Sequence, residues 1–412
     1  MTGAGRLSSG LQPVTANAAP LCLSCTVDRR LQCVSALAAA SVRWGNPIRS
    51  PRYPELGVDS DPRRRRAIAL FVGLDVSLRT TSICVVEANG SLVWEGKAES
   101  EPTMLIKALI GWRSEIALVG LEACPLSEWL FGALVESGFQ TVCIETRHAQ
   151  RFLSSRPNKT DRSDARGIAE MLRLGHYRPV HVKSKASQLL RTTLTARQKF
   201  AEHMVAIETT IRGSLKVHGL KLGNVHRCTF AIRVETLLTD APELRIAIEP
   251  LLEVRNMMRK QKILLDRQLG AIARKDGVCK LLMTIPGVGP IVSLAFKATI
   301  DDPSRLKDSK AVAAHLGLTP RIYQSGEIDR SGHISKCGDK MMRHALYEAA
   351  NSQLRISKKW SVLRAQGVKL AKRAGSKKAC VAIARKLAVI MHRMWVDGTE
   401  FRFGQQAVAE AA

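Results

Sequence analysis

The chain has 412 residues, of which 45% are hydrophobic and 24% are charged, so it can bury two ordinary cores and is neither wholly disordered nor a mini-protein. Its 63 lysines and arginines outnumber 36 acids, a formal net charge of +27, which predicts a polyanionic partner, with nucleic acid as the first candidate. No apolar run approaches the roughly 18 residues that cross a bilayer, which excludes a membrane-spanning protein. Ten cysteines, mostly scattered singly, are typical of the reducing cytoplasm.

Both ends of the chain are predicted to lie outside the folded domains. Residues 1–66 contain ten arginines, no lysine and six of the sixteen prolines, without sustained hydrophobic periodicity, so we expect a disordered extension. Its run from Arg63 to Arg66 is either solvated charge or a nucleic-acid-binding arm, and the sequence leaves open whether this stretch is translated. Residues 405–412 are expected to be a short tail.

A strand-rich pattern begins at residue 67. Three antiparallel strands are expected, with a turn at Asn89-Gly90 between the second and the third: residues 67–76, 81–87 and 91–97. A helix, a strand, a helix and a strand follow, at residues 102–112, 116–121, 125–137 and 140–144. The order βββαβαβ is the one used by ribonuclease-H-like domains, so we assign residues 67–180 to an α/β domain.

The rest of the chain is predicted to be helical. Apolar residues recur at three-to-four spacing between residues 186 and 274, which indicates a long helical pair within residues 181–276. These helices either cover a core or form an antiparallel coiled-coil arm that also joins protomers. Residues 277–404 follow as a basic helical domain, with fifteen lysines or arginines against two acids between residues 331 and 395, a concentration that favours nucleic-acid binding.

Four carboxylates are candidates for a metal site. Asp75 lies inside an otherwise apolar strand, where a charge is costly unless it is compensated, and Glu122 ends a second apolar strand. If the first and fourth strands are neighbours, these two acids repel each other unless a cation intervenes. Asp161 and Asp164 are three apart at the start of a predicted helix and project from one face.

Oxygen-only ligands of this kind suit Mg²⁺ or Mn²⁺. Two such ions about 4 Å apart can activate an attacking oxygen and stabilise a leaving one in phosphoryl transfer. The alternative for the last two acids is structural, with Asp161 capping the helix and Asp164 paired with Arg162 or Arg166. The buried position of Asp75 and the order of all four acids favour metal binding.

Several motifs in both halves of the chain resemble the DEDD transposases of bacterial insertion sequences, family one-ten with its eleven-eleven subgroup. The resemblance covers about residues 68 to 402. In the first half it rests on Gly73-Leu-Asp-Val76, Glu122-Ala-Cys124 and Lys159-Thr-Asp-Arg-Ser-Asp-Ala165. In the second half it rests on Ile285-Pro-Gly-Val-Gly-Pro290, Ala313-Ala-His-Leu-Gly-Leu-Thr-Pro320, Ser325-Gly326, Gly332-His-Ile-Ser-Lys336 and Asp397-Gly-Thr-Glu-Phe401.

The resemblance implies a RuvC-like, ribonuclease-H-type domain, a coiled-coil linker and a C-terminal transposase domain that supplies a serine nucleophile. It also implies a structured guide RNA that pairs with donor and target DNA. Ser325 is the chosen nucleophile, with Ser331 and Ser335 as alternates, although Gln324 stands where the family commonly has another serine. Basic residues around it are expected to neutralise a scissile phosphate or contact the nucleic-acid backbone: Arg321, Arg330, Lys336, Lys340 and Arg343.

The expected function is therefore site-specific transposition, with DNA strands cut and rejoined through a phosphoserine by a homodimer or homotetramer in the cytoplasm. The acids Glu327 and Asp329 depart from the usual pattern near the serine and are expected to weaken anion binding. Two rival functions remain at this point. One is a plain metal-dependent nuclease, which needs the four carboxylates but not Ser325. The other is a catalytically silent nucleic-acid-binding protein.

Overall fold

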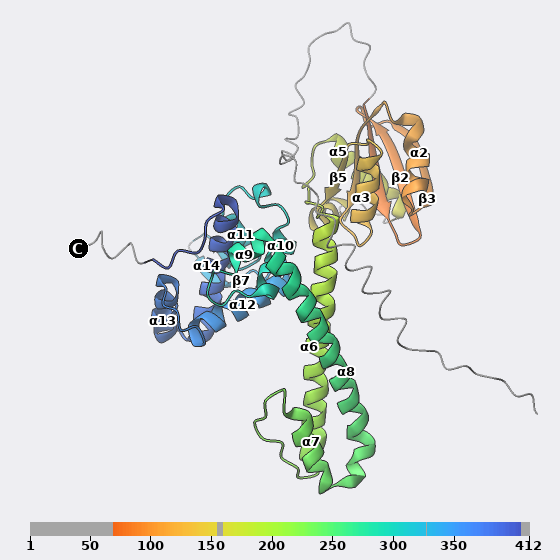
Figure 1. The fold of residues 1–412 in the computed structure, drawn as a ribbon. Coiled ribbons are helices and arrows are strands. Elements are labelled where there is room, and N and C mark those ends of the chain that lie inside the picture. Colours follow the sequence, from red (N-terminus) through yellow and green to blue (C-terminus); the bar gives the residue numbers. More distant parts are fainter. Residues whose placement is uncertain (1–68, 155–159, 327, 405–412) are drawn as a thin grey trace, which may run out of the picture. The chain divides into compact units, whose positions relative to one another are not determined.

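The computed structural model describes residues 69–154, 160–326 and 328–404 (Figure 1). The predicted extension at residues 1–66 and the predicted tail at residues 405–412 lie outside these ranges. Within the described residues, no helix has both the length and the apolar character needed to cross a membrane.

A five-stranded sheet forms the first folded part. Its strands are β1 (Leu70–Val76), β2 (Thr80–Glu87), β3 (Leu92–Glu99), β4 (Ile116–Glu122) and β5 (Thr141–Ile144). They lie in the order β3-β2-β1-β4-β5, with β1, β2 and β3 antiparallel and with β4 parallel to both β1 and β5. Three consecutive antiparallel strands followed by parallel additions at the β1 edge give the ribonuclease-H-like arrangement, so the predicted fold class is confirmed.

Helices cover both faces of this sheet. On one face, α2 (Pro102–Leu109) and α3 (Ser127–Glu136) pack on the apolar side chains that β1 presents at every second position, from Leu70 to Leu74. On the other face lies α5 (Asp161–Arg173), with α4 (Thr146–Leu153) beside it. The sheet is therefore the middle layer of three, and its central strand β1 is shielded from water on both sides.

The expected helical pair is present, but it has a third member. Helix α6 (Lys185–Val217) packs along α8 (Arg245–Lys275), and α7 (Phe230–Thr239) lies between them in the chain. Phe230 and Val234 of α7 bury themselves against the far ends of α6 and α8 in a small separate core. The near ends, through Leu194 and Leu269, belong to the core of the C-terminal helices. One end of the pair thus covers a core, while the other end has a core of its own.

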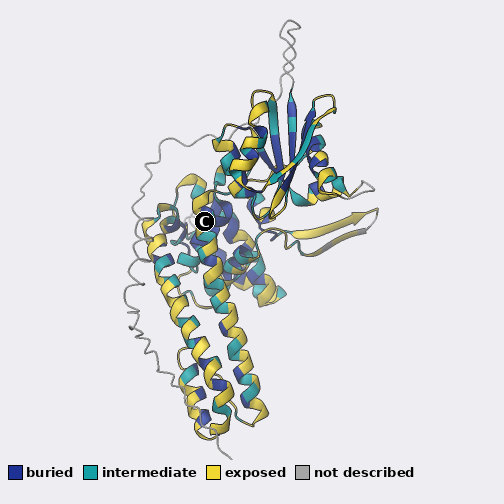
Figure 2. Ribbon diagram, turned by 90° about the vertical axis from the view of Figure 1, so that its right-hand side faces the viewer, coloured by how far each residue is buried: buried dark blue, intermediate teal, exposed yellow. Residues whose placement is uncertain are grey.

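The C-terminal part is mostly helical, as predicted, but it contains a hairpin that the pattern did not indicate. Its helices are α9 (Gly277–Leu282), α10 (Pro290–Ile300), α11 (Ala311–His315), α12 (Lys340–Arg355), α13 (Val362–Ala374) and α14 (Ser376–Asp397). Strands β6 (Pro320–Ser325) and β7 (Ile328–Ile334) pair antiparallel between α11 and α12. Buried residues gather in the sheet and in the C-terminal helices, whereas the long helices are exposed over much of their surface (Figure 2).

Candidate active site

Asp75 and Glu122 lie at the same edge of the sheet. The parallel register of β1 and β4 pairs Gly73 with Gly120 and Leu74 with Leu121, and each acid is the next residue of its strand. Since side chains alternate between the two faces of a strand, Asp75 shares a face with Gly73, and Glu122 shares that same face with Gly120. The sequence-predicted neighbourhood of these two carboxylates is thus present in the backbone.

Helix α5 lies directly on this face. A Cβ atom added to Gly73 would come within 3.0 Å of the backbone of Ala165 and Ala169, so only glycine permits this close approach of helix to strand. At the other end of α5, Arg173 donates to the Ala88 carbonyl at 3.2 Å, and the neighbouring Glu87 pairs with Leu70, the first residue of β1. Helix α5 therefore runs opposite to β1, and its N-terminus lies toward the edge that carries Asp75.

Asp161 and Asp164 occupy the first turn of α5. The helix begins there because Thr160 caps it: the Thr160 hydroxyl accepts from the Ser163 backbone N–H at 3.1 Å, and the Thr160 N–H donates to the Ser163 hydroxyl at 3.0 Å. The structural alternative in which Asp161 is the cap is therefore wrong. Both carboxylates stay at the positive end of the helix, near the edge of the sheet that carries the strand acids.

The four acids suit a divalent cation by donor type and by backbone placement. Within the described residues, no group of three or more His, Cys, Asp or Glu side chains lies close enough to hold a metal ion. The Asp161 carboxylate instead pairs with the Lys97 ammonium at 3.7 Å, and the two side chains are 61% and 60% exposed. An exposed ion pair contributes little free energy, so a cation can displace Lys97 from Asp161.

Ser325 ends strand β6 on the hairpin. It faces Ile328 across the turn, and it is exposed together with every other residue of β6. The following Gly326 has φ +55° and open space around its α-carbon, a backbone conformation that favours glycine. Ser325 is thus accessible to a large substrate, whereas Ser335 sits at the base of the hairpin, where its backbone N–H donates to the Thr319 carbonyl at 2.8 Å.

The predicted phosphate contacts divide into two groups. Arg330 pairs with Tyr323 in the hairpin register and is exposed, as are Lys336 and Lys340. Arg321 is exposed but donates to the Ser335 carbonyl at 3.2 Å. Arg343 is half-buried and donates to the carbonyls of Leu316 and Cys337, at 3.2 and 2.7 Å. Arg321 and Arg343 therefore bond to the backbone at the base of the hairpin, whereas Arg330, Lys336 and Lys340 present their charge at the surface.

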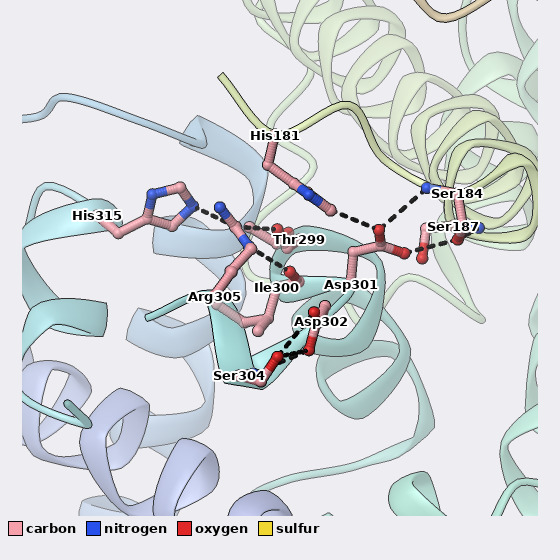
Figure 3. A network of polar contacts seen from close by, with 10 residues as sticks. All are labelled: His181, Ser184, Ser187, Thr299, Ile300, Asp301, Asp302, Ser304, Arg305 and His315. Atoms are coloured by element: carbon pink, nitrogen blue, oxygen red, sulfur yellow. Dashed lines mark hydrogen bonds and ion pairs between the residues drawn. The ribbon is translucent and has the colours of Figure 1, made fainter. Parts of the chain in front are cut away.

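A polar network that the sequence pattern did not indicate centres on Asp301, at the end of α10 (Figure 3). Its carboxylate accepts from the Ser184 hydroxyl at 2.6 Å and from the Ser184 N–H at 3.0 Å, and it contacts the His181 ring at 2.7 Å. Burial alone would raise the pKa of Asp301, but the hydrogen bonds from His181 and Ser184 outweigh it and hold this pKa well below its usual range. The network ties the segment that enters α6 to the end of α10.

Two cations adjoin this network. Arg305 donates from Nε to the Ile300 carbonyl at 2.9 Å, and its Nη2 lies 3.1 Å from the His315 ring. Burial, followed by the nearby Arg191 charge, lowers the pKa of Lys183 to about 8. The residues of the network are up to 120 positions apart, so no local motif could have predicted it.

Comparison with known proteins gives consistent results along the chain. Residues 72–219 match a family model described as a transposase of the DEDD type, and residues 279–365 match the model of the transposase IS116/IS110/IS902 family. The transposase for insertion sequence element IS1111A of Coxiella burnetii is 26% identical over 349 residues, which cover 83% of this chain and 94% of that protein. A probable family 20 transposase of Pseudomonas aeruginosa is 27% identical over 70% of this chain and 86% of its own length.

Among solved structures, RuvC of Thermus thermophilus is similar, with 14% identity and a TM-score of 0.21 over 27% of this chain and 99% of RuvC. The order and direction of the five strands establish the ribonuclease-H-like arrangement of this chain.

Proposed function

Since two family models and relatives matched over most of their length support an insertion-sequence transposase of the IS110/IS116/IS902 family, we propose that this chain cuts and rejoins DNA through a phosphoserine at Ser325. The observation that carries the proposal is the placement of Asp75 and Glu122 on one face of adjacent strands, beside the first turn of α5. We also propose three working parts: residues 67–180 for metal binding, 181–276 as linker, and 277–404 for the serine.

The carboxylates supply the metal-binding half of the site. Asp75, Glu122, Asp161 and Asp164 would hold Mg²⁺ or Mn²⁺, and the bound ions would supply charge neutralisation at the scissile phosphate. Gly73 keeps α5 against β1 and so fixes the distance between the strand acids and the helix acids. The exposed pair with Lys97 would leave Asp161 available to such an ion.

The hairpin supplies the nucleophile. The Ser325 Oγ attacks phosphorus, the bond from phosphorus to the leaving 3′-oxygen breaks, and the serine proton ends on that oxygen as a free 3′-hydroxyl. The 5′-phosphate remains on Ser325 until a 3′-hydroxyl of another strand reverses the step, so no external energy source is needed. Arg330 and Lys336, on the same exposed hairpin and at its base, neutralise the phosphate.

Strand exchange between two DNA partners requires more than one copy of the site. We therefore propose a homodimer or homotetramer in which the long helices join protomers and Ser325 is delivered to the carboxylates. A guide RNA is the second proposed nucleic-acid partner, accommodated with DNA on the basic C-terminal surface. Both partners place the activity in the cytoplasm, where the bacterial DNA lies.

One experiment separates this mechanism from a plain metal-dependent nuclease. The protein is incubated with Mg²⁺ and DNA that carries the ends of its element, and denatured products are searched for strands attached to protein. Wild type should give such strands, Ser325→Ala should give neither attached strands nor joined products, and Asp75→Ala should bind DNA without cutting it. Cutting and joining by Ser325→Ala at the wild-type level would leave the nuclease, and an Asp75→Ala variant with unchanged cleavage would remove the metal site.

A further inference from the structure

An exposed tryptophan stands at the start of α13 in the most basic region of the chain. Trp360 is 53% exposed, although a large aromatic side chain usually gains from burial. It lines a hollow of about 430 Å³ together with Arg364, Val368, Lys369 and Lys372 of α13. The hollow thus combines a flat aromatic side chain with cations and a small apolar surface.

This hollow continues into a second one. The second hollow, of about 300 Å³, shares Val368 and Lys372 with the first and adds Arg355 at the end of α12. The residues that line the two hollows include four lysines or arginines and no acid. Exposed Lys358 and Lys359 directly precede Trp360 in the chain and add to the positive charge of this segment.

Arg364, on the first turn of α13, contributes to the hollow and has one nitrogen without a hydrogen-bond partner in the described part of the chain. Its Nε atom is buried and has no hydrogen-bond partner within the described residues. Because Arg364 lines the hollow, the positive charge of its guanidinium is available to an anionic oxygen there.

We propose that this groove, formed by Trp360 and the basic face of α13, binds unpaired nucleotides, with a base stacked on Trp360 and phosphates on Arg364, Lys369 and Lys372. Stacking on aromatic rings beside a cationic track is how proteins hold single-stranded nucleic acid. A duplex would leave the aromatic face unused, because its bases are already stacked and only its phosphates are presented. An acidic protein segment would use the cations, but the apolar surface here is short and suits one planar ring.

The inference rests on the proposed function, since transposition supplies the nucleic acid and leaves unpaired strands on cut DNA or on a guide RNA. Single-stranded DNA and single-stranded RNA share the chemistry that the groove recognises. The test therefore includes both, together with a duplex that controls for simple charge attraction.

The full-length protein is titrated, at one fixed salt concentration, with oligothymidine and with oligouridine of about 12 nucleotides and with a DNA duplex of the same length. Trp360→Ala should weaken binding of the single strands about 5- to 100-fold and leave duplex affinity nearly unchanged. Trp360→Phe should restore most of the loss, because phenylalanine also stacks. Preference for oligouridine would identify the occupant as RNA, and preference for oligothymidine would identify it as DNA.

The chain offers a matched control in Trp129, which is 47% exposed but lies on α3 beside Glu128. Trp129→Ala removes a similar exposed ring and should leave all three affinities unchanged. Tryptophan fluorescence is measured as oligothymidine is added to wild type and to Trp360→Phe. The quenching that wild type shows and Trp360→Phe lacks comes from Trp360 and not from the other five tryptophans. Replacing Lys369 and Lys372 together by alanine should lower the salt dependence of binding by about two ions.

Equal loss of single-strand and duplex affinity in Trp360→Ala, or no loss in either, would overturn the inference. Dissociation of a dimer by Trp360→Ala with single-strand affinity intact would also overturn it, because the groove would then hold a second copy of the chain. Failure of the proposed function gives a different result: Ser325→Ala would cut and join DNA at the wild-type level, whatever Trp360→Ala does to single-strand binding. If Asp75→Ala binds the single strands in a Trp360-dependent way yet cuts no DNA, both proposals are supported.

Discussion

The edge of the five-stranded sheet and the β6–β7 hairpin carry the two halves of the proposed site, and they are built in opposite ways. Asp75 belongs to a central strand covered by helices on both faces, whereas Ser325 belongs to a strand in which every residue is exposed. A glycine lies close to each residue in the chain: Gly73, two positions before Asp75, allows close packing, and Gly326, directly after Ser325, has a positive φ in open space. The strand acids of the proposed metal site are therefore held by the core, whereas the proposed nucleophile stands on an exposed strand outside it.

The largest expected effect follows from adding a methyl group at Gly73. Gly73→Ala places a Cβ atom against the backbone of α5, so we expect the free energy of unfolding to fall by about 3 kcal/mol. The same displacement moves Asp161 and Asp164 away from Asp75, and DNA cleavage should fall with stability. Urea unfolding and a metal-dependent cleavage assay on the same preparation measure both effects.

A second glycine of the same domain provides the control. Gly132 lies inside α3 and has open space around its α-carbon, so Gly132→Ala should stabilise the protein by about 0.5–1 kcal/mol and leave cleavage unchanged. If the urea midpoint of Gly73→Ala equals that of wild type, α5 does not pack on β1 at Gly73, and the core does not fix the position of Asp75.

A smaller effect is expected at Lys183, in the segment that joins the two regions. Because the folded pKa of Lys183 is about 8 and that of an unfolded lysine is about 10.4, the folded state holds fewer protons between these values. Stability should therefore rise with pH from about 8 to about 10.4 and should carry a cost at neutral pH. The difference between these pKa values corresponds to about 3 kcal/mol, and partial exposure of Lys183 to solvent reduces it. Lys183→Met should therefore remove this rise and stabilise the protein by about 2 kcal/mol at pH 7.

The measurement is the urea midpoint of both proteins from pH 7 to pH 10.5. Lys185, two positions later and 80% exposed, provides the control, because Lys185→Met should leave the pH dependence of wild type in place. A parallel rise of stability in wild type and in Lys183→Met would show that another group titrates in this interval.

The same contrast explains what the sequence could predict. The sheet follows from runs and alternation of apolar residues, and the turn at Asn89-Gly90 connects β2 to β3 as expected, because burial on two faces leaves a strong local pattern. The sequence does not predict the β6–β7 hairpin. Every residue of Pro320–Ser325 is exposed to solvent, so this strand has no need of an alternating apolar pattern. The third helix α7 was missed because its apolar residues serve a small core built from distant ends of α6 and α8.

The candidate site divides along the same line. The positions of Asp75 and Glu122 followed from strand patterns and from the neighbourhood of β1 and β4. The ion pair of Asp161 with Lys97 could not be predicted, because it depends on how β3 and α5 are placed in space. The Asp301 network has the same origin, and Trp360 is recognised only once its exposure beside α13 is known.

The smallest effect on stability is expected at Gly326. Valine there must adopt φ near the observed +55°, which costs a branched residue roughly 1–2 kcal/mol locally. The hairpin can open and relieve this strain, so the free energy of unfolding, measured by urea, should stay within about 0.5 kcal/mol of wild type. The turn then opens, Ser325 is displaced, and formation of protein-linked DNA should fall about 100-fold.

Gly326→Asn should retain more activity, since asparagine tolerates this conformation. A Gly326→Val variant as unstable as Gly73→Ala would show that the β6–β7 hairpin is part of the folded core, as the edge of the sheet is.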